Sequence, residues 1–207
     1  MDIYLTRHGQ TISNVNGILQ GQLPGELTES GTLQARKLGL RLKDEHFDAI
    51  YSSDLHRCIQ TLSEVAPHHP YAEPILDSRI REKSAGELEG QKLGIIEKMA
   101  KAQGTSTRLY RPPGGETWGE VHERASSVFR DLCERHIEGP AKKVLVISHS
   151  GWIKEFINVI RRARNQPTAG HVKSSNTALY IIRVQAKGNA AVPTVILEND
   201  TTHLKTK

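Results

Sequence analysis

Residues 143–151, Lys-Val-Leu-Val-Ile-Ser-His-Ser-Gly, decide the fold of this chain. The run 144–147 is apolar and rich in β-branched side chains, and polar residues flank it. Such a run is typical of a strand that is buried on both faces, as in a parallel sheet covered by helices. We therefore expect residues 143–147 to be an inner strand of a parallel sheet, with Ser148 and His149 at its carboxyl end.

Outward from this strand, strand-like and helix-like patterns alternate along most of the chain. We predict further strands at 2–6, 47–51, 71–76, 178–184 and 193–197, and helices at 28–42, 55–65, 92–102, 121–136 and 153–160. This alternation predicts an α/β protein, a three-layer α/β/α sandwich whose sheet is mainly parallel and covered by helices on both faces. We expect residues 1–207 to form a single domain, with residues 77–115 as a lid inserted over one end of the sheet.

Local signals mark the ends of two of these helices. Ser53 and Asp54 precede the helix at 55–65 and are residue types that cap helix N-termini. The run 161–164, Arg-Arg-Ala-Arg, is interpreted as the end of the helix at 153–160, because cations are favoured there. A surface that binds nucleic acid would carry a longer basic stripe, interleaved with aromatic residues. We therefore expect no nucleic-acid partner.

The composition is that of a soluble globular protein of 207 residues, with 37% apolar and 25% charged residues. The formal net charge of +5 is compatible with an anionic substrate without identifying it. Cys58 and Cys133 lie far apart, so we expect neither a disulfide framework nor a zinc site. No run approaches the roughly 20 apolar residues that cross a bilayer, and no signal-peptide pattern is present. We expect a cytoplasmic protein without a membrane partner; the sequence carries no signal for an oligomeric state.

Three predicted strands end in residues that suit a phosphate group. Arg7 and His8 follow the first strand, and Arg57 lies in the first turn of the helix after the second. His149 follows the strand at 143–147. Ligands of parallel α/β sheets bind at the carboxyl ends of the strands, so we expect these side chains to share one pocket.

These residue types fit the transfer of a phosphoryl group. Negative charge spreads over its three equatorial oxygens, and the planar forks of Arg7 and Arg57 can each bind two of them. A neutral His8 can attack phosphorus, and a histidine pKa of roughly 6.5 makes the neutral ring available near neutral pH. His149 can donate a hydrogen bond to the same oxygens.

The departing alkoxide needs a proton, and a carboxylic acid is the usual donor. Glu82 begins the predicted lid, just beyond the third strand, and is the predicted general acid; Glu87 and Glu89 are nearby rivals. Taken singly, each candidate also has a structural explanation: His149 as a core histidine, and Arg57 or Glu82 as solvated residues. The prediction depends on the whole set. The other histidines show no metal-ligand spacing, so we expect no metal and no cofactor.

With these residues in view, the chain resembles the histidine phosphatase superfamily, also called the phosphoglycerate mutase-like proteins. The resemblance rests on four ordered blocks: RHGQT at 7–11 with Asn14, SSDL at 52–55 with Arg57 and Thr61, Arg81-Glu82 with Gly86 and the pair 89–90, and Ser148-His149. It implies the phosphoglycerate mutase-like fold, a phosphohistidine on His8, and Glu82 as acid and base. It also implies a phosphate pocket that contains Arg7, Arg57 and His149.

By the same resemblance Asn14, Gly21 and Ser150 lie near the substrate. Segments 20–22, 77–82, 99–104, 112–117 and 175–177 are similar to fructose-2,6-bisphosphatases of the TIGAR type. That similarity implies a small anionic substrate such as fructose 2,6-bisphosphate or 2,3-bisphosphoglycerate. The candidates for choosing among such substrates are the lid side chains around Arg108, Tyr110 and Arg111.

Two positions depart from the family pattern. Position 10 is Gln where acidic residues are frequent, and position 150 is Ser where Gly is usual. Neither change removes a catalytic group, but Ser150 alters the backbone beside the phosphate, so we expect an effect on rate.

Two alternatives to a phosphatase remain open. A mutase would use the same residues and return the phosphoryl group to the substrate at another position. The chain is short for an elaborate mutase lid, and the TIGAR-like segments favour hydrolysis. A binding module that no longer turns over would keep the pocket only, which the intact set of five catalytic candidates argues against.

Overall fold

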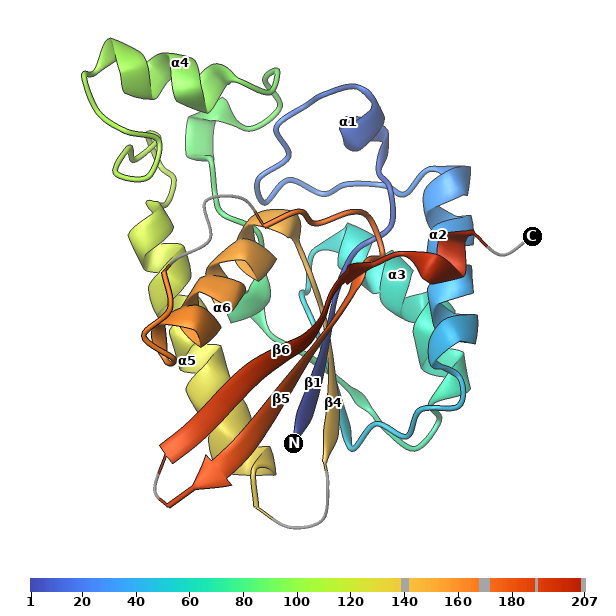
Figure 1. Ribbon diagram of the computed structural model, residues 1–207. Helices are drawn as coiled ribbons and strands as arrows, with labels where there is room; N and C mark the ends of the chain where they lie inside the picture. The colour runs from blue at the N-terminus through green and yellow to red at the C-terminus, as the bar shows by residue number, and fades with distance from the viewer. Residues whose placement is uncertain (139–141, 168–171, 189, 206–207) are drawn as a thin grey trace.

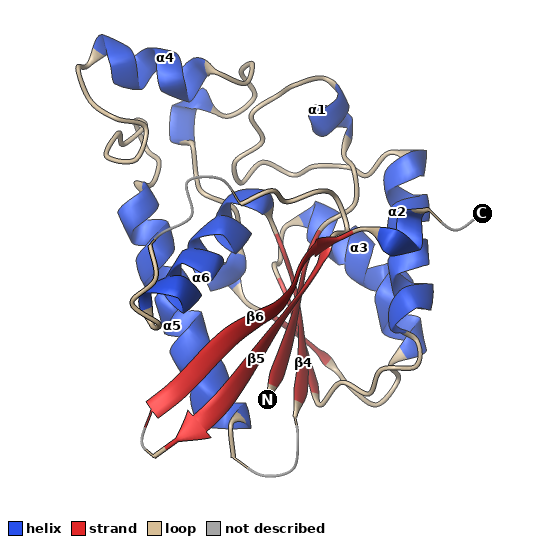
Figure 2. Ribbon diagram, viewed as in Figure 1, coloured by secondary structure: helices blue, strands red, loops and turns tan. Residues whose placement is uncertain are grey.

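The computed structural model describes residues 1–138, 142–167, 172–188 and 190–205. It confirms the predicted α/β fold. A six-stranded sheet has the strand order β3-β2-β4-β1-β5-β6, and helices lie on both of its sides (Figures 1 and 2). The strands are β1 (Asp2–Arg7), β2 (Ala49–Ser52), β3 (Pro74–Leu76), β4 (Lys143–Ser148), β5 (Leu179–Lys187) and β6 (Ala190–Asp200). The helices are α1 (Ile12–Val15), α2 (Glu29–Leu42), α3 (His56–Val65), α4 (Ile95–Ala102), α5 (Trp118–His136) and α6 (Ser150–Arg162).

The sheet is mixed. Strands β3, β2, β4 and β1 are parallel to one another, as predicted, whereas β5 pairs antiparallel with β1 and β6 pairs antiparallel with β5. The strand pattern at 178–184 and 193–197 gave the position of β5 and β6 but not their direction. The short connection between β5 and β6 explains why these two strands pair antiparallel, because a hairpin joins antiparallel neighbours, whereas a parallel pair needs a long crossover.

Two apolar cores lie on opposite faces of the sheet. Side chains of α5 and α6, among them Phe129, Trp152 and Phe156, pack on one face. Leu38 of α2 and Leu62 of α3 belong to the core of the other face. Residues 144–147 contribute to both cores and are fully buried, as a strand covered on both faces requires. This arrangement is the predicted three-layer sandwich.

The predicted capping of α3 is wrong. The N-cap residue is Leu55, which makes no side-chain cap hydrogen bond. Ser53 Oγ accepts a hydrogen bond from Leu55 N, and Asp54 is paired with Arg81, so both side chains serve other partners. The run at 161–164 does end a helix, because α6 closes with Arg161 and Arg162 in its last turn.

The region predicted as a lid has a small core of its own. Ala85, Leu88, Ala100 and Tyr110 are buried together beneath α4, apart from the two sheet cores. In Figure 1 α4 lies beyond the end of the sheet at which β1 and β4 finish. No helix of the described ranges is both long and apolar enough to cross a bilayer.

Candidate active site

A pocket of about 660 Å³ opens at the carboxyl ends of β1 and β4. These strands are parallel neighbours with Arg7 opposite Ser148 in register, so the residues that follow them meet at one edge of the sheet. Seven of the eight predicted site residues line the pocket: Arg7, His8, Asn14, Gly21, Arg57, Glu82 and Ser150. His149 is not among the lining residues.

His8 has one ring nitrogen free for chemistry. Its Nδ1 lies 2.7 Å from Gly9 O, and because a carbonyl only accepts, Nδ1 must carry the proton. Nε2 of the neutral ring therefore keeps its lone pair. The side chain is 2% exposed, and burial, reinforced by the charges of Arg7 and Arg57, holds the pKa of His8 well below its ordinary value. The imidazole is thus neutral at physiological pH.

Arg7 offers a donor that no described residue accepts. Its Nη1 donates to Ser174 O at 2.7 Å. Its Nε is buried and has no hydrogen-bond partner within the described part of the chain. A buried guanidinium N–H without an acceptor is costly, and Arg7 lines the pocket, so this guanidinium favours an anionic ligand there.

Arg57 is almost fully buried and tied to the protein by three hydrogen bonds. Its Nε donates to His149 Nδ1 at 3.1 Å, Nη1 to Leu23 O at 2.8 Å and Nη2 to Gly21 O at 2.8 Å. A guanidinium has five N–H groups, so one N–H on each terminal nitrogen is left for a ligand. Arg57 therefore joins the pocket wall at 21–23 to the end of β4 and still faces the pocket.

His149 is placed differently from the prediction. Because Nδ1 accepts from Arg57, the ring proton is on Nε2, which donates to Ser53 Oγ at 2.8 Å. Both ring nitrogens are thus engaged inside the protein, and no donor remains for phosphate. Burial, followed by the charge of Arg57, holds the pKa of His149 well below its ordinary value. Cys58 Sγ lies 3.4 Å from Nε2, and burial raises the pKa of that thiol to about 12, so it stays protonated.

Glu82 reaches the pocket from the segment after β3. Its Oε2 accepts a hydrogen bond from Gly151 N at 3.0 Å, in the first turn of α6, and its Oε1 accepts from Lys83 N at 2.9 Å. A Cβ at position 151 would lie 2.3 Å from Glu82 Oε1, so only glycine allows this approach. Of the rivals, Glu89 accepts hydrogen bonds from Gln22 N and Ala85 N at loop positions, and neither Glu87 nor Glu89 lines the pocket.

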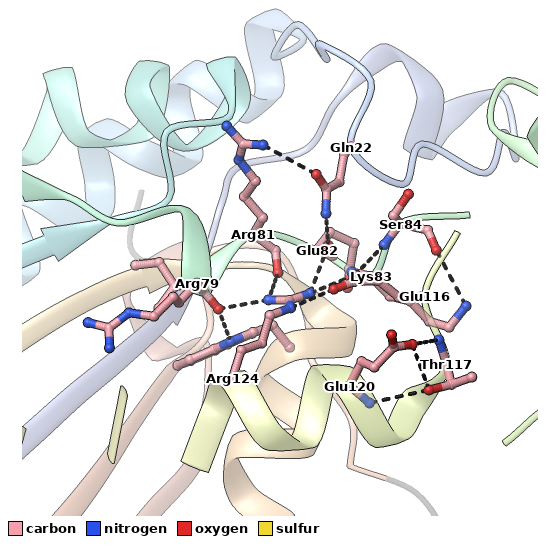
Figure 3. A network of polar contacts seen from close by, with 12 residues as sticks. Gln22, Arg79, Arg81, Glu82, Lys83, Ser84, Glu116, Thr117, Glu120 and Arg124 are labelled. Carbon is pink, nitrogen blue, oxygen red and sulfur yellow. Dashed lines mark hydrogen bonds and ion pairs between the residues drawn. The ribbon is translucent and has the colours of Figure 1, made fainter. Parts of the chain in front are cut away.

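Arg124 on α5 fixes the segment that carries Glu82, and the sequence analysis missed it. Its terminal nitrogens donate to the carbonyl oxygens of Arg79, Arg81 and Glu82 at 2.6–3.0 Å, as Figure 3 shows. Nε also pairs with Glu116 at 2.9 Å. These contacts join α5 to the backbone on either side of residue 81. One arginine on a polar helix face has no sequence signal that distinguishes it from a solvated residue.

The three lid side chains expected to select the substrate do not line the pocket. Arg108 pairs with the fully buried Glu155 of α6 at 2.9 Å. Arg111 pairs with Glu120 at 2.8 Å, and Tyr110 is 1% exposed within the small core beneath α4. These three side chains therefore contact other parts of the protein. Thr107, next to Arg108, does line the pocket, and a role of this segment in choosing the substrate stays a prediction.

Comparisons with known proteins agree with the fold and the motifs. A profile of the histidine phosphatase superfamily (branch 1) matches residues 3–195. The fructose-2,6-bisphosphatase TIGAR of Bos taurus is 37% identical over 134 residues, which are 63% of this chain and 50% of that protein. This chain thus spans about half the length of the TIGAR relatives that it matches.

Two further relatives match over more of their length. A broad-specificity phosphatase of Saccharomyces cerevisiae is 32% identical over 184 residues, 87% of this chain and 78% of that protein. The solved structure of a phosphoglycerate mutase from Bacillus anthracis superposes with a TM-score of 0.83 at 26% identity, covering 99% of this chain and 95% of that one. The profile match extends over nearly the whole sequence and includes all four motif blocks. The chain therefore belongs to the histidine phosphatase superfamily.

Proposed function

We propose that this protein is a metal-independent phosphatase that carries the phosphoryl group on His8. One observation carries the proposal: His8, whose Nε2 keeps its lone pair, lines the same pocket as Arg7, whose buried Nε has no acceptor among the described residues. A phosphate monoester satisfies both, because it supplies an oxygen to the arginine and an electrophilic phosphorus to the histidine.

The proposed cycle has two half-reactions. In the first, His8 Nε2 attacks phosphorus, the bond from phosphorus to the ester oxygen breaks, and Glu82 gives its proton to that oxygen. In the second, the Glu82 carboxylate removes a proton from water, the water oxygen attacks phosphorus, and the N–P bond breaks. Inorganic phosphate leaves, and His8 and Glu82 return to their starting protonation states.

The arginines supply the electrostatic stabilisation. The free Nε of Arg7 and the two remaining terminal N–H groups of Arg57 can bind the equatorial oxygens, whose charge must be neutralised during transfer. His149 acts as a positioning residue in this scheme, because its Nδ1 holds Arg57 Nε. Asn14, Gly21 and Ser150, which line the same pocket, complete the proposed substrate contacts.

The proposed substrate is a small phosphoester, with fructose 2,6-bisphosphate and 2,3-bisphosphoglycerate as leading candidates. The similarity to TIGAR supports the first, and the similarity to a broad-specificity phosphatase supports a wider range. Hydrolysis of such metabolites fits a cytoplasmic location. In this proposal residues 1–207 act as one domain, and residues 77–115 form its lid.

A mutase is the second candidate, and the similarity to a solved phosphoglycerate mutase favours it. The two activities differ in the acceptor of the second half-reaction. Incubation with 3-phosphoglycerate separates them: release of inorganic phosphate supports the phosphatase, whereas conversion to 2-phosphoglycerate without phosphate release supports the mutase.

Rapid-quench trapping tests the proposal itself. With a substrate labelled in the phosphoryl group, we expect an acid-labile phosphoprotein in the wild type and none in His8→Ala. Glu82→Gln should slow turnover by ~10²–10⁴-fold, with a smaller loss for p-nitrophenyl phosphate, whose leaving group needs no acid. Activity should persist in excess EDTA. Tight binding of phosphoesters without any label would instead support a non-catalytic binding module.

A further inference from the structure

Two lysines share one tryptophan at the wall of the pocket. Lys83 Nζ lies 5.7 Å from the centroid of the Trp118 ring, and Lys154 Nζ lies 5.8 Å from it. All three residues line the pocket that holds His8. They come from three separate segments: Lys83 from the loop after β3, Trp118 from the first turn of α5, and Lys154 from α6.

The lysine pair lies close to the predicted acid. Lys83 directly follows Glu82 in the chain. Lys154 is three residues beyond Gly151 on α6, so the two positions lie on the same helix face. A Cβ at Gly151 would lie 2.8 Å from Trp118 Cη2, so the indole adjoins the contact between Gly151 and Glu82. The indole that both ammonium groups contact is therefore next to Glu82, the proposed proton donor.

Neither ammonium group forms an ion pair with a carboxylate of the described residues. Within the described ranges, Lys154 Nζ makes no ion pair and no hydrogen bond, and Lys83 Nζ makes only a 3.5 Å contact to Ser84 O. Lys83 is 8% exposed. Burial lowers its pKa, although Glu116, Glu82 and Glu120 act in the opposite direction. Burial of a lysine without a direct ion pair is costly, so this placement favours an anion that comes from outside the chain.

The other cations near the pocket are engaged elsewhere, so the two lysines remain to bind a further anionic group. The lid arginines at 108 and 111 are paired with carboxylates elsewhere. Arg7 and Arg57 are needed for the phosphoryl group that is transferred. The lining contains these four cations against two carboxylates, Glu82 and Glu97, so its charge favours a ligand with more than one anionic group.

We propose that Lys83 and Lys154 form a second anion subsite, which binds a phosphate or carboxylate group of the substrate while its other phosphoryl group lies on Arg7 and Arg57. This proposal rests on the proposed phosphatase function. It assigns substrate selection to α6 and the start of the lid, with Trp118 holding both lysines by cation–π contacts.

Three substrates that share a carbon skeleton test the subsite. Glycerol 3-phosphate has no second anionic group, 3-phosphoglycerate adds a carboxylate, and 2,3-bisphosphoglycerate adds a carboxylate and a phosphate. The readout is kcat/KM for each substrate that has a second anionic group, divided by kcat/KM for glycerol 3-phosphate. We expect Lys83→Met and Lys154→Met to lower this ratio by about tenfold each, since loss of one partly buried ion pair costs about that factor. Lys154→Arg should keep the ratio within about threefold, because it retains the charge.

Lys101→Met is the matched control, because Lys101 is an exposed lysine of α4 that does not line the pocket. A double variant Lys83→Met/Lys154→Met that hydrolyses glycerol 3-phosphate with an unchanged ratio overturns the subsite and leaves the phosphatase standing. Loss for 2,3-bisphosphoglycerate alone identifies the group bound as phosphate; loss for both identifies it as carboxylate.

Failure of the proposed function gives a different result, namely no hydrolysis of any of the three compounds by the wild type. Calorimetric titration with the same compounds then still decides the subsite. We expect the double variant to bind 2,3-bisphosphoglycerate about 100-fold more weakly than the wild type, and equal affinities would reject the proposal.

Discussion

The ends of β1 and β4 lie side by side, and each carries a buried histidine, yet the two histidines are used differently. His8 at the end of β1 lines the pocket and has Nδ1 bound to a neighbouring carbonyl, while Nε2 has no hydrogen bond to a described residue. His149 at the end of β4 has both nitrogens bound, one to Arg57 and one to Ser53. Their ring centroids are 5.2 Å apart.

The difference teaches that strand position alone does not define the role of a site residue. Both histidines follow parallel neighbouring strands, and burial lowers the pKa of both. What separates them is the set of partners around each ring. The end of β4 contributes to the pocket through Ser150 and through the backbone N–H of Gly151, which binds Glu82, rather than through its histidine.

Replacing each histidine by alanine is the strongest test of this contrast. We expect His8→Ala to lower kcat by ~10⁴-fold or more and to abolish the phosphoprotein, because the nucleophile is lost. His149→Ala should lower kcat by only about 10²-fold and retain the label, because it displaces Arg57 without removing a reacting atom. Quench-flow labelling of both variants, with circular dichroism to check the fold, measures this. Loss of the label in His149→Ala would break the contrast.

Gly151→Ala tests the backbone contribution of the β4 end. The new Cβ would lie 2.3 Å from Glu82 Oε1, so the carboxyl group must move. We expect kcat for sugar phosphates to fall by about 10–100-fold, with a smaller fall for p-nitrophenyl phosphate. Gly119→Ala is the matched control, because its Cβ would meet nothing nearer than 3.5 Å. Equal losses for both substrates would mean that Glu82 is not the acid.

The pH dependence of stability is the smallest of the expected effects. It tests the property that the two histidines share, a lowered pKa in the folded chain. Both have a pKa well below the ordinary value in the folded chain, through burial and then arginine charge. As the pH falls through about 6.5, the unfolded chain takes up protons that the folded chain does not. The contribution of the two histidines to the free energy of unfolding is therefore fully present above this pH and is lost progressively below it. Each histidine should contribute a slope approaching about 1.4 kcal/mol per pH unit.

Urea unfolding of the wild type, His8→Asn and His149→Asn between pH 7.5 and 5 measures these slopes. We expect each variant to depend less steeply on pH than the wild type does. A wild-type slope that survives both replacements would assign the acid sensitivity to other groups, such as the buried His203, whose pKa burial also lowers.

Much of this fold was predictable because its signals are local. The apolar run at 144–147 indicated a strand buried on both faces, and the spacing of apolar residues at 121–136 indicated α5. The antiparallel direction of β5 and β6 depends on pairing between strands, which no window of sequence contains. The cap of α3 was misjudged because Asp54 has a partner 27 residues away, Arg81.

The candidate site shows the same division. The lining by Arg7, His8 and Arg57 follows from strand ends, which sequence can place. The tautomer and partners of His149 depend on Ser53 and Arg57, which only the folded chain brings together. Lys154 and Arg124 were missed because each is a single cation on a helix. Lys154 is distinguished only by its contact with Trp118, and Arg124 only by its hydrogen bonds to the backbone at 79–82.

The position of β1 at the centre of the sheet has a consequence for synthesis of the protein. Residues 2–7 emerge from the ribosome before their neighbours, residues 143–148 and 179–183. At roughly 5–20 residues per second, the chain carries this apolar strand unpaired for on the order of ten seconds before β4 appears. The nascent chain therefore exposes the strand that precedes His8 until residues 143–148 are synthesised, and we expect chaperones that hold unfolded chains to engage it during that time.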